Sequence, residues 1–173
     1  KVNATYEIGK AKTGDGLKYA EDKIDDILGV PIHYAVRLDF SGFAKAIDLV
    51  SGIDVDVSNT FDDYEYPVEA KREELCGHTI EEATELIASM SATEVFPCRY
   101  THVHFNKGAQ HMSGDKALIF VRSRYGNNGE GSDFARSKRQ QKVIQALREK
   151  ALSLGILLNP VKVSNLFNLL KNS

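Results

Sequence analysis

The first sixty residues alternate between the hydrophobic spacing of helices and that of strands. Apolar residues at helical spacing predict a helix that Gly29 ends, namely Leu17, Ala20, Ile24, Ile27 and Leu28. Residues 30–40 alternate and predict a strand with one covered face, and residues 53–57 predict a shorter strand. Ser41 is expected to cap an intervening helix that ends at Gly52 and has the core stripe Phe43, Ala46, Ile47 and Val50. Helices and strands that alternate over short connections predict an α/β domain.

A polar and acidic segment, residues 58–99, interrupts this pattern. Its first part, DDYEYPVEAKREE, is expected to be an exposed loop. Further along, Thr79 and Glu82 form a capping box, which predicts the start of an amphipathic helix. We therefore interpret residues 58–99 as an insertion within a single domain of residues 1–173.

The rest of the chain predicts one more strand and three helices. Residues 100–105 have the character of a strand, and Ser113 or Asp115 then starts a short helix. A longer helix begins at Asp133 and carries the apolar stripe Val143, Leu147 and Leu154. Pro160 at a first helical position predicts a last helix with the apolar residues Leu166, Phe167, Leu169 and Leu170.

The composition is typical of a soluble globular chain. The 173 residues are 42% hydrophobic and 27% charged, and the net charge of −2 argues against general binding to nucleic acids. No apolar run approaches the roughly 18 residues of a membrane span. Cys76 and Cys98 lack metal-binding spacing, and the residues by themselves leave two free thiols and a disulfide equally open.

A cationic stretch within this acidic chain is the strongest functional signal. Residues 117–147 contain six Arg and Lys residues and only two acidic ones, so they carry +4 while the rest of the chain carries −6. Arg122 and Arg124 end an apolar run, and after a Gly/Asn loop Arg136 and Gln140 share one face of the long helix. Cations in a first helical turn oppose the helix dipole. A bound phosphate would complete such a site, because guanidinium groups grip phosphate oxygens bidentately.

The same stretch also has a plain structural interpretation. A basic helix start is often only a solvated surface, but the R-x-R motif and the R-x-x-x-Q motif favour an anion site, with Arg139 beside it. Asp133 is either the helix cap and a counter-charge of the arginines, or a general base or metal ligand next to phosphate. No motif of a nucleophilic enzyme or a Walker loop is present. Phosphoryl transfer suits such a site, because it depends mainly on positioning and charge stabilisation.

Two further groups of polar residues are interpreted as solvent-facing. His102 and His104 alternate on one strand face and could bind zinc, but a third ligand at motif spacing is missing. Several acidic residues of the insertion could bind a hard cation but lack the spacing of an EF-hand: Asp62, Asp63, Glu65 and Glu69. Exposed histidines and a solvated acidic loop are therefore favoured.

Four motifs span most of the chain, from Lys1 to about Leu147. They are KVNATYEIG, LGVPIHYAVRLDFSGFAKAIDLVSGIDVDV, HMSGDKALIFVRSR and DFARSKRQQKVIQAL. In their order and spacing they resemble the LytR-CpsA-Psr family. This resemblance implies an α/β fold with a central mixed β-sheet flanked by helices on both faces. It also implies a phosphotransferase that moves a cell-wall glycopolymer, such as teichoic acid or capsule, from a polyprenyl-pyrophosphate carrier to peptidoglycan.

The resemblance also implies roles for individual residues. Arg122, Arg124 and Asp133 match the family's catalytic positions. The residues implied to bind the pyrophosphate are Lys1, Arg122, Arg124, Arg136, Arg139 and Gln140. Mg²⁺ is the implied cofactor, and its aspartates are expected in two N-terminal strands, with R-x-D-T and P-R-D motifs, that this chain lacks. We therefore expect no metal ligand of that site in this chain.

The family further implies a place of action and partners. It works on the extracytoplasmic face of a bacterial membrane, held by an N-terminal membrane helix that this chain does not contain, and an oxidising location favours a disulfide between Cys76 and Cys98. The apolar faces of helices and sheet are expected to line a slot for the prenyl chain. Two alternatives remain: a non-catalytic module that binds polyprenyl phosphate or an anionic polymer, and a pyrophosphate hydrolase that uses the same site. Nucleic-acid binding is disfavoured by the overall charge and by the lack of a helix-turn-helix signal.

Overall fold

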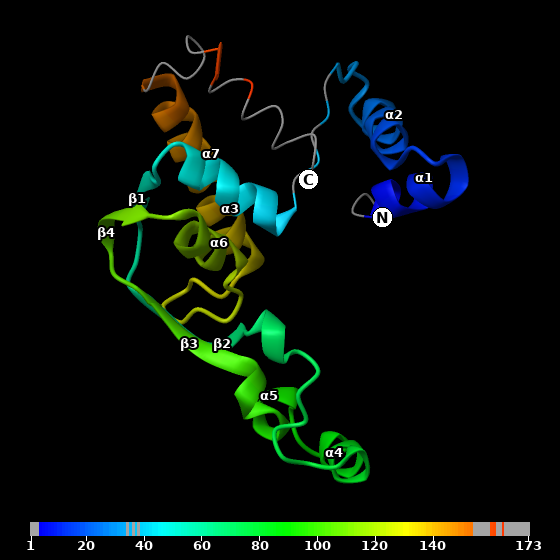
Figure 1. Cartoon of the computed structure of the whole chain (residues 1–173), viewed down its shortest axis with the longest axis vertical. Coiled ribbons are helices and arrows are strands. Elements are labelled where there is room, and N and C mark those ends of the chain that lie inside the picture. Colours follow the sequence, from blue (N-terminus) through cyan, green and yellow to red (C-terminus); the bar gives the residue numbers. More distant parts are fainter. Residues whose placement is uncertain are drawn as a thin grey trace.

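The chain folds into α-helices and two small antiparallel sheets (Figure 1). The computed structural model describes residues 4–33, 35, 37, 39–153, 160, 161 and 164. The helices are α1 (Thr5–Thr13), α2 (Gly16–Leu28), α3 (Phe40–Leu49), α4 (Ile80–Ile87), α5 (Ala92–Val95), α6 (Gly114–Arg122) and α7 (Asp133–Ser153). The strands are β1 (Ile53–Val57), β2 (Phe61–Pro67), β3 (Tyr100–Phe105) and β4 (Gly108–Met112). Two short 3-10 helices, η2 (Glu69–Lys71) and η3 (Pro97–Arg99), complete the described elements.

Each sheet pairs two strands that lie far apart in the sequence. β1 pairs with β4, with Ile53 opposite Met112, and β2 pairs with β3, with Phe61 opposite Phe105. The α/β class is therefore confirmed. Within the described part of the chain, the strands form these two antiparallel pairs in place of one central mixed sheet.

The strand expected over residues 30–40 is not formed by those residues of the range that the structure describes. Residues 30–33, 35, 37 and 39 have no strand pairing, and α3 begins at Phe40. Tyr34, Val36 and Leu38 lie outside the described residues. Hydrophobic alternation shows only that a segment can cover one face, whereas a strand also needs a neighbour that pairs with its backbone. Among the described strands, none pairs with this segment.

Local hydrogen bonds explain where the helices begin. The carboxylate of Asp39 accepts a hydrogen bond of 2.6 Å from the N–H of Gly42, so Asp39 caps α3 and the expected cap at Ser41 is wrong. The physical reason is that a carboxylate two residues earlier already satisfies a free N–H of the first turn. Ser113 caps α6, and Thr79 with Glu82 forms the capping box of α4, both as predicted.

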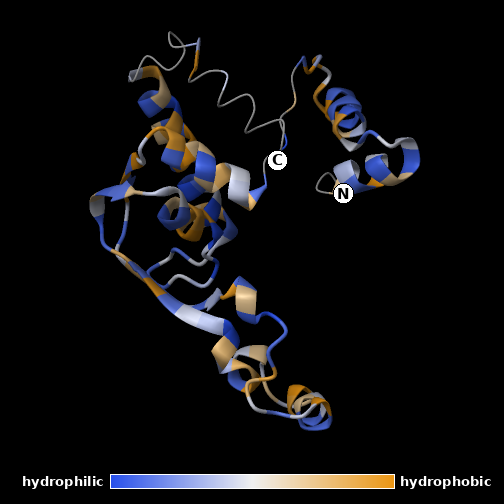
Figure 2. Ribbon diagram, viewed as in Figure 1, coloured by the Kyte–Doolittle hydropathy of each residue, from blue (hydrophilic) through white to orange (hydrophobic). Residues whose placement is uncertain are grey.

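The main hydrophobic core lies between the β1–β4 pair and helices α3, α6 and α7. Its fully buried side chains include Ile47, Ile53, Met112, Phe120 and Val143. Orange hydrophobic segments alternate with blue polar ones along the three helices in Figure 2, as expected for helices that each bury one face. α3 and α6 approach so closely that a Cβ atom at Gly114 would collide with the backbone of Ala44, so only glycine fits there.

α1 and α2 form a helical hairpin that Figure 1 shows apart from the main core. Close contact within the hairpin requires two glycines, because a Cβ atom at Gly9 would collide with Tyr19 and one at Gly16 with Tyr6. α2 is the helix predicted from the sequence, and Gly29 ends it in a left-handed conformation. Its apolar stripe, however, is not core: Leu17, Ala20 and Ile24 are half-buried, and Ile27 and Leu28 are exposed. The stripe predicted the helix correctly, but α2 packs against α1 and not into the main core.

The end of the chain is only partly covered by the structure. The predicted stripe residue Leu154 and the apolar residues of the last predicted helix, 166–170, lie outside the described residues. Across the described ranges, no helix combines the length and the hydrophobicity that crossing a membrane requires.

The segment of residues 58–99 contains a strand and a small second core. Its first part was expected to be an exposed loop, but β2 pairs with β3 and buries Phe61, Asp63 and Tyr66. That expectation is wrong because the acidic residues mask a strand whose alternate side chains turn inward. Beyond β2, α4 and α5 enclose a cluster that includes Ala83, Val95 and Phe96. The interpretation of the whole segment as an insertion stays a prediction.

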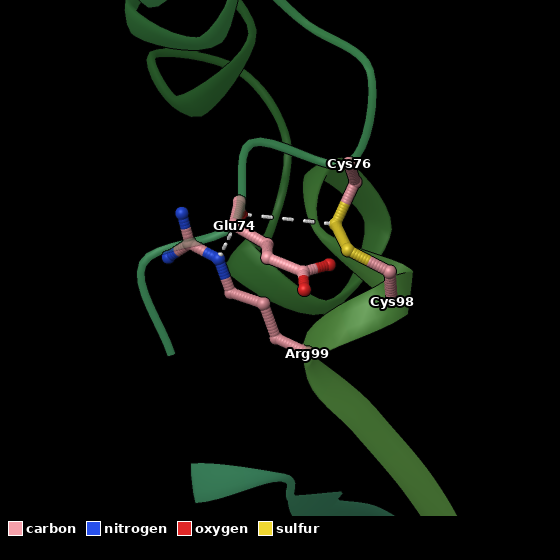
Figure 3. Close-up of a disulfide and its surroundings, with 4 residues drawn as sticks. All are labelled: Glu74, Cys76, Cys98 and Arg99. Atoms are coloured by element: carbon pink, nitrogen blue, oxygen red, sulfur yellow. Dashed lines mark hydrogen bonds between the residues drawn. A yellow bond between two sulfur atoms is a disulfide. The ribbon is translucent and has the colours of Figure 1, made fainter. Parts of the chain in front are cut away.

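A disulfide between Cys76 and Cys98 closes this second core (Figure 3). The pairing that the family resemblance favoured is thus confirmed. Next to it, the Nε of Arg99 donates a hydrogen bond of 2.6 Å to the backbone carbonyl of Glu74 (Figure 3). The segments that contain Cys76 and Cys98 are therefore joined by a disulfide and also by a hydrogen bond between neighbouring residues.

Replacing both cysteines with alanine should lower the free energy of unfolding by roughly 3 kcal/mol, because the disulfide closes a loop that the unfolded chain otherwise explores freely. The two sulfurs are separated by 22 positions in the sequence. Urea denaturation of the double variant, compared with oxidised wild type, measures this effect. Wild type in reducing buffer should have the same midpoint as the double variant, and a reduced wild type as stable as the oxidised one would contradict the prediction.

Candidate functional site

One surface pocket brings together four of the residues predicted to bind an anion. Arg122, Arg124, Arg136 and Gln140 all line a pocket of about 490 Å³. Other residues that line it include Phe40, Glu65, Tyr100 and Tyr125. The pocket is thus surrounded by residues of α6 and α7 and by residues of β2 and β3, which lie earlier in the sequence.

Two helices place the four predicted side chains. α6 ends at Arg122, and Arg124 lies two residues beyond it in the connection to α7. Arg136 and Gln140 lie one turn apart in the first part of α7, so they point to the same side of that helix. The end of one helix and the beginning of another therefore meet at the pocket.

Arg122 is held by an aromatic ring and a carboxylate. Its guanidinium carbon lies 4.2 Å from the centre of the Phe40 ring, and its Nη2 donates a hydrogen bond of 3.2 Å to Glu69. The Arg122 side chain is 23% exposed, so these contacts fix it without removing it from solvent. The ring of Tyr66 lies 5.9 Å away. Burial raises the pKa of the Tyr66 phenol, and this outweighs the positive charge of Arg122, which lowers it. The phenol therefore stays neutral.

The two other arginines of the pocket differ in their partners. Arg136 forms an ion pair of 2.9 Å with Asp133, whose side chain is 79% exposed. The Arg124 guanidinium makes no hydrogen bond or ion pair with any residue that the structure describes, although its backbone N–H is bonded. Exposed ion pairs contribute little stability, on the order of 1 kcal/mol or less. A bound anion could therefore replace these carboxylates at low cost.

Asp63 fixes the backbone of the connection between α6 and α7, residues 123–132, which we call the arginine loop. It is fully buried, and its Oδ2 accepts hydrogen bonds from the Ser123 hydroxyl (2.6 Å), the Arg124 N–H (3.1 Å) and the Tyr125 N–H (3.2 Å). Its Oδ1 accepts a bond of 2.9 Å from the N–H of Glu65. The prediction that Asp63 lies in a solvated loop is therefore wrong. It is a buried anchor for the segment that presents Arg124.

Arg139 does not line this pocket. Its side chain is only 4% exposed and forms an ion pair of 2.7 Å with the buried Glu130. Three of the four other guanidinium N–H groups donate to the backbone carbonyls of Phe120 (2.9 Å), Ser123 (2.6 Å) and Glu130 (2.7 Å). Arg139 thus ties α7 to the end of α6 and to the loop between them. Its contacts favour a positioning role over direct contact with an anion.

Asp133 and Lys1 are the two remaining predicted site residues. Asp133 is the first residue of α7 and lies outside the pocket lining, beside Arg136. Lys1 lies outside the described residues, so its assignment stays a prediction.

An apolar pocket adjoins the arginine pocket. It has a volume of about 270 Å³, and Phe43, Leu118, Val121 and Ile144 contribute its apolar walls. Phe40, Val121, Arg122 and Gln140 line both pockets. A ligand with a charged group and a hydrocarbon group could therefore contact both.

The lining of the arginine pocket, as far as the structure describes it, offers Mg²⁺ one free carboxylate, that of Glu65. Mg²⁺ prefers one or two free carboxylates together with phosphate oxygens and water. Both oxygens of Asp63 already accept hydrogen bonds from the protein, which leaves Glu65 as the carboxylate of the pocket lining. The Mg²⁺ requirement implied by the family stays a prediction.

A second polar cluster lies on the exposed face of the β2–β3 pair. His102 and His104 are exposed, as predicted, but the structure also brings Asp62 within 2.8 Å of both rings. Hydrogen bonds from His104 and His102 lower the pKa of Asp62, and the bond to Asp62 raises the pKa of His104. The sequence could have revealed this residue only through the register of the sheet, in which Asp62 stands opposite His104.

Comparison with known proteins gives a consistent result. A family model described as the LytR_cpsA_psr family matches residues 1–173. The polyisoprenyl-teichoic acid–peptidoglycan teichoic acid transferase TagV of Bacillus subtilis (strain 168) is 29% identical over 153 residues, which cover 88% of this chain and 29% of TagV. TagU of Bacillus mycoides (strain KBAB4), a transferase of the same description, is 28% identical over 157 residues, 91% of this chain and 37% of TagU. The chain thus spans roughly a third of the length of these curated relatives.

Solved structures show the same fold. The crystal structure of B. subtilis TagV matches with a TM-score of 0.54 and 28% identity, over 87% of this chain and 41% of that one. A structure of TagT (YwtF) with bound octaprenyl pyrophosphate lipid matches with a TM-score of 0.51 and 17% identity, over 98% of this chain and 52% of that one. The second likeness concerns the fold alone.

Proposed function

Because the chain belongs to the LytR-CpsA-Psr family, we propose that it is the phosphotransferase part of an enzyme that attaches a cell-wall glycopolymer to peptidoglycan. The donor in this proposal is a polyprenyl-pyrophosphate-linked polymer of the teichoic acid or capsule type. The observation that carries it is the convergence of Arg122, Arg124, Arg136 and Gln140 on one pocket that adjoins an apolar one. The names of TagV and TagU support the polymer class.

The pocket suits a pyrophosphate in charge and geometry. Three guanidinium groups offer planar forks that can each bind two phosphate oxygens, and the Gln140 amide adds a neutral donor. Arg124 has no competing side-chain partner among the described residues, so it is free to bind the ligand first. The neighbouring apolar pocket, with Phe43, Leu118 and Ile144, would take the first part of the prenyl chain.

The proposed reaction moves one phosphoryl group. A hydroxyl oxygen of peptidoglycan forms a bond to the phosphorus that carries the glycopolymer, and the bond from that phosphorus to the polyprenyl phosphate breaks. Arg122 and Arg124 stabilise the negative charge that develops on the phosphoryl oxygens and on the leaving phosphate. Asp133 keeps Arg136 in place through their ion pair, and its role as a base for the hydroxyl proton stays a prediction. Mg²⁺, when bound, would neutralise further phosphate charge.

We also propose an extracytoplasmic place of action for the intact protein, anchored at its N-terminal side. The disulfide between Cys76 and Cys98 supports this, because such bonds persist in oxidising compartments. The wall-polymer substrates named for the relatives support it as well.

Replacing Arg124 with alanine should weaken binding of farnesyl pyrophosphate, a short soluble analogue of the carrier lipid, by about tenfold to hundredfold, since two charge-assisted hydrogen bonds are lost. Isothermal titration calorimetry measures the affinity. Arg148, an exposed arginine on α7 that does not line the pocket, provides the matched control when replaced with alanine.

Equal losses in both variants would show that binding depends on overall charge, and the proposed pocket would be wrong. Turnover separates the remaining alternatives in the intact protein. Release of polyprenyl phosphate that requires added peptidoglycan supports the transferase. Release without an acceptor favours the hydrolase, and tight binding with no release favours the non-catalytic module.

A further inference from the structure

Three potential metal ligands meet on the exposed face of the β2–β3 pair, away from the arginine pocket. They are the Oδ1 of Asp62, the Nε2 of His102 and the Nδ1 of His104, and all lie within 4.8 Å of one another. The backbone explains the convergence. His102 and His104 are two positions apart on β3 and point to the same side, and Asp62 stands directly opposite His104 on β2.

The neutral form of His104 can offer one ring nitrogen to a metal ion. Its Nδ1 lies 2.8 Å from Asp62 Oδ1, and its Nε2 lies 3.1 Å from Asn106 Oδ1, so both ring nitrogens face an oxygen acceptor. A neutral imidazole carries a proton on one nitrogen only. If Nε2 donates its proton to Asn106, Nδ1 offers a lone pair toward Asp62, and a metal ion between the two would bind both.

The rest of the cluster is arranged like the surroundings of a metal site. A metal-binding histidine commonly donates its other N–H to a carbonyl or carboxylate, which fixes the ring, and Asn106 can do this for His104. The ring of His102 is stacked on that of Tyr64, with 4.3 Å between their centres and an angle of 11° between their planes. Both imidazoles are therefore oriented by neighbours that are not ligands.

We propose that Asp62, His102 and His104 bind a zinc ion, with water completing a tetrahedral site. Zinc accepts imidazole nitrogen and carboxylate oxygen at about 2.0–2.2 Å, and one carboxylate with two neutral imidazoles gives the site a charge suited to a dication. Mg²⁺ should not bind, because it prefers oxygen ligands in an octahedral arrangement. This site is separate from any Mg²⁺ used with the pyrophosphate and does not depend on the proposed function.

The position of the cluster suggests what the zinc ion would do. β2 and β3 lead at one end, at Pro67 and Tyr100, into the segment that α4, α5 and the disulfide occupy. The ion would bridge the two strands toward the other end, next to the pair of Phe61 and Phe105 in the main core. The backbone of Asp62 also exchanges hydrogen bonds with Asn127 of the arginine loop, through Asn127 N–H (3.0 Å) and Asn127 Oδ1 (2.9 Å). Zinc would therefore hold together the strand pair on which that loop rests.

The test is titration of the 173-residue chain, without a histidine tag, with zinc chloride in a calorimeter. We expect saturation at one zinc ion per chain, no heat with magnesium chloride, and a higher melting temperature with zinc. His104→Ala and His102→Ala should each weaken zinc binding by at least about a hundredfold, since loss of an outer partner alone costs about 10–100-fold. Asn106→Ala should fall within that smaller range.

His111→Ala is the matched control. His111 is also an exposed strand histidine with its Nδ1 2.8 Å from a carboxylate, that of Asp54, but this pair belongs to no three-ligand cluster among the described residues. Its zinc affinity should equal that of wild type. Absence of saturable zinc binding would overturn the proposal, and so would binding that survives both His102→Ala and His104→Ala.

A measurement on the unaltered chain covers the case in which a variant does not fold. Imidazole nitrogen signals in NMR spectra report metal coordination directly. On addition of zinc, the signals of His102 Nε2 and His104 Nδ1 should shift together. Shifts confined to other histidines would overturn the proposal.

Discussion

Replacing Arg139 with methionine should lower the free energy of unfolding by about 4 kcal/mol, within the range of 3–5 kcal/mol typical of a broken buried ion pair. Methionine fills a similar volume but leaves Glu130 buried and charged without its partner. It also removes the donors to the carbonyls of Phe120 and Ser123. Unsatisfied buried polar groups make such a change costly. Urea denaturation, followed by circular dichroism, measures the loss.

A second substitution, at Glu130, tests whether the loss of stability in Arg139→Met arises from the broken ion pair. Adding Glu130→Gln to Arg139→Met removes the unpaired charge and should restore part of the stability. Arg148→Met on the same helix is the control and should change stability little, because Arg148 is exposed. A double variant less stable than Arg139→Met would contradict this account.

Replacing Asp63 with alanine should also cost about 4 kcal/mol, because three buried or half-buried donors lose one shared acceptor and each such loss costs about 1–3 kcal/mol. The donors are the Ser123 hydroxyl and the N–H groups of Arg124 and Tyr125. Since these bonds fix the arginine loop, the variant should also bind farnesyl pyrophosphate more weakly than wild type under conditions where it is still folded.

Asp56→Ala provides a control for this prediction. Asp56 is on β1, its side chain is 77% exposed, and its one ion pair is long at 3.8 Å. Its loss should leave both stability and binding close to wild type. If Asp63→Ala lost stability but kept full affinity, the loop would be held in place by other contacts, and the positioning role of Asp63 would be refuted.

Elements set by local signals were predictable from the sequence. α6 begins after its predicted cap, Ser113, and α7 begins at Asp133 as predicted. The Ser132 hydroxyl, and not Asp133, accepts the capping hydrogen bond of α7, from the Ala135 N–H at 3.1 Å. Arg122, Arg124, Arg136 and Gln140 meet in one pocket, as the R-x-R and R-x-x-x-Q motifs indicate. Helix spacing is determined within a few residues, so the sequence alone carries it.

The burial of Arg139 and Asp63 could not be recognised from the pattern of charges. Both residues, however, stand at positions where the helical or strand repeat points toward the core. Arg139 lies four residues before the buried Val143 and therefore on the core face of α7, whereas Arg136 lies toward the pocket. Asp63 is two residues after the buried Phe61 and so shares its face of β2. In both cases the position along the repeat, and not the residue type, decides burial.

Features that depend on pairing between distant segments were the ones that the sequence analysis missed or misplaced. Residues 30–40 alternate like a strand, yet a pattern within one segment does not specify a neighbour. Asp62 reaches the two histidines only through the register of β2 and β3, which join residues about forty positions apart.

Two carboxylates beside the arginine pocket give it a threshold for its ligands. Glu69 pairs with Arg122 and Asp133 pairs with Arg136. An anion that binds either of these two arginines must therefore displace a carboxylate of the protein, at a cost of about 1 kcal/mol or less for each exposed pair. A singly charged group such as a carboxylate gains little by exchanging with another carboxylate. A ligand with two linked phosphates can displace both at once and bind Arg124 as well, which favours it over singly charged anions. The acidic neighbours of the pocket thus give multiply charged ligands a modest advantage.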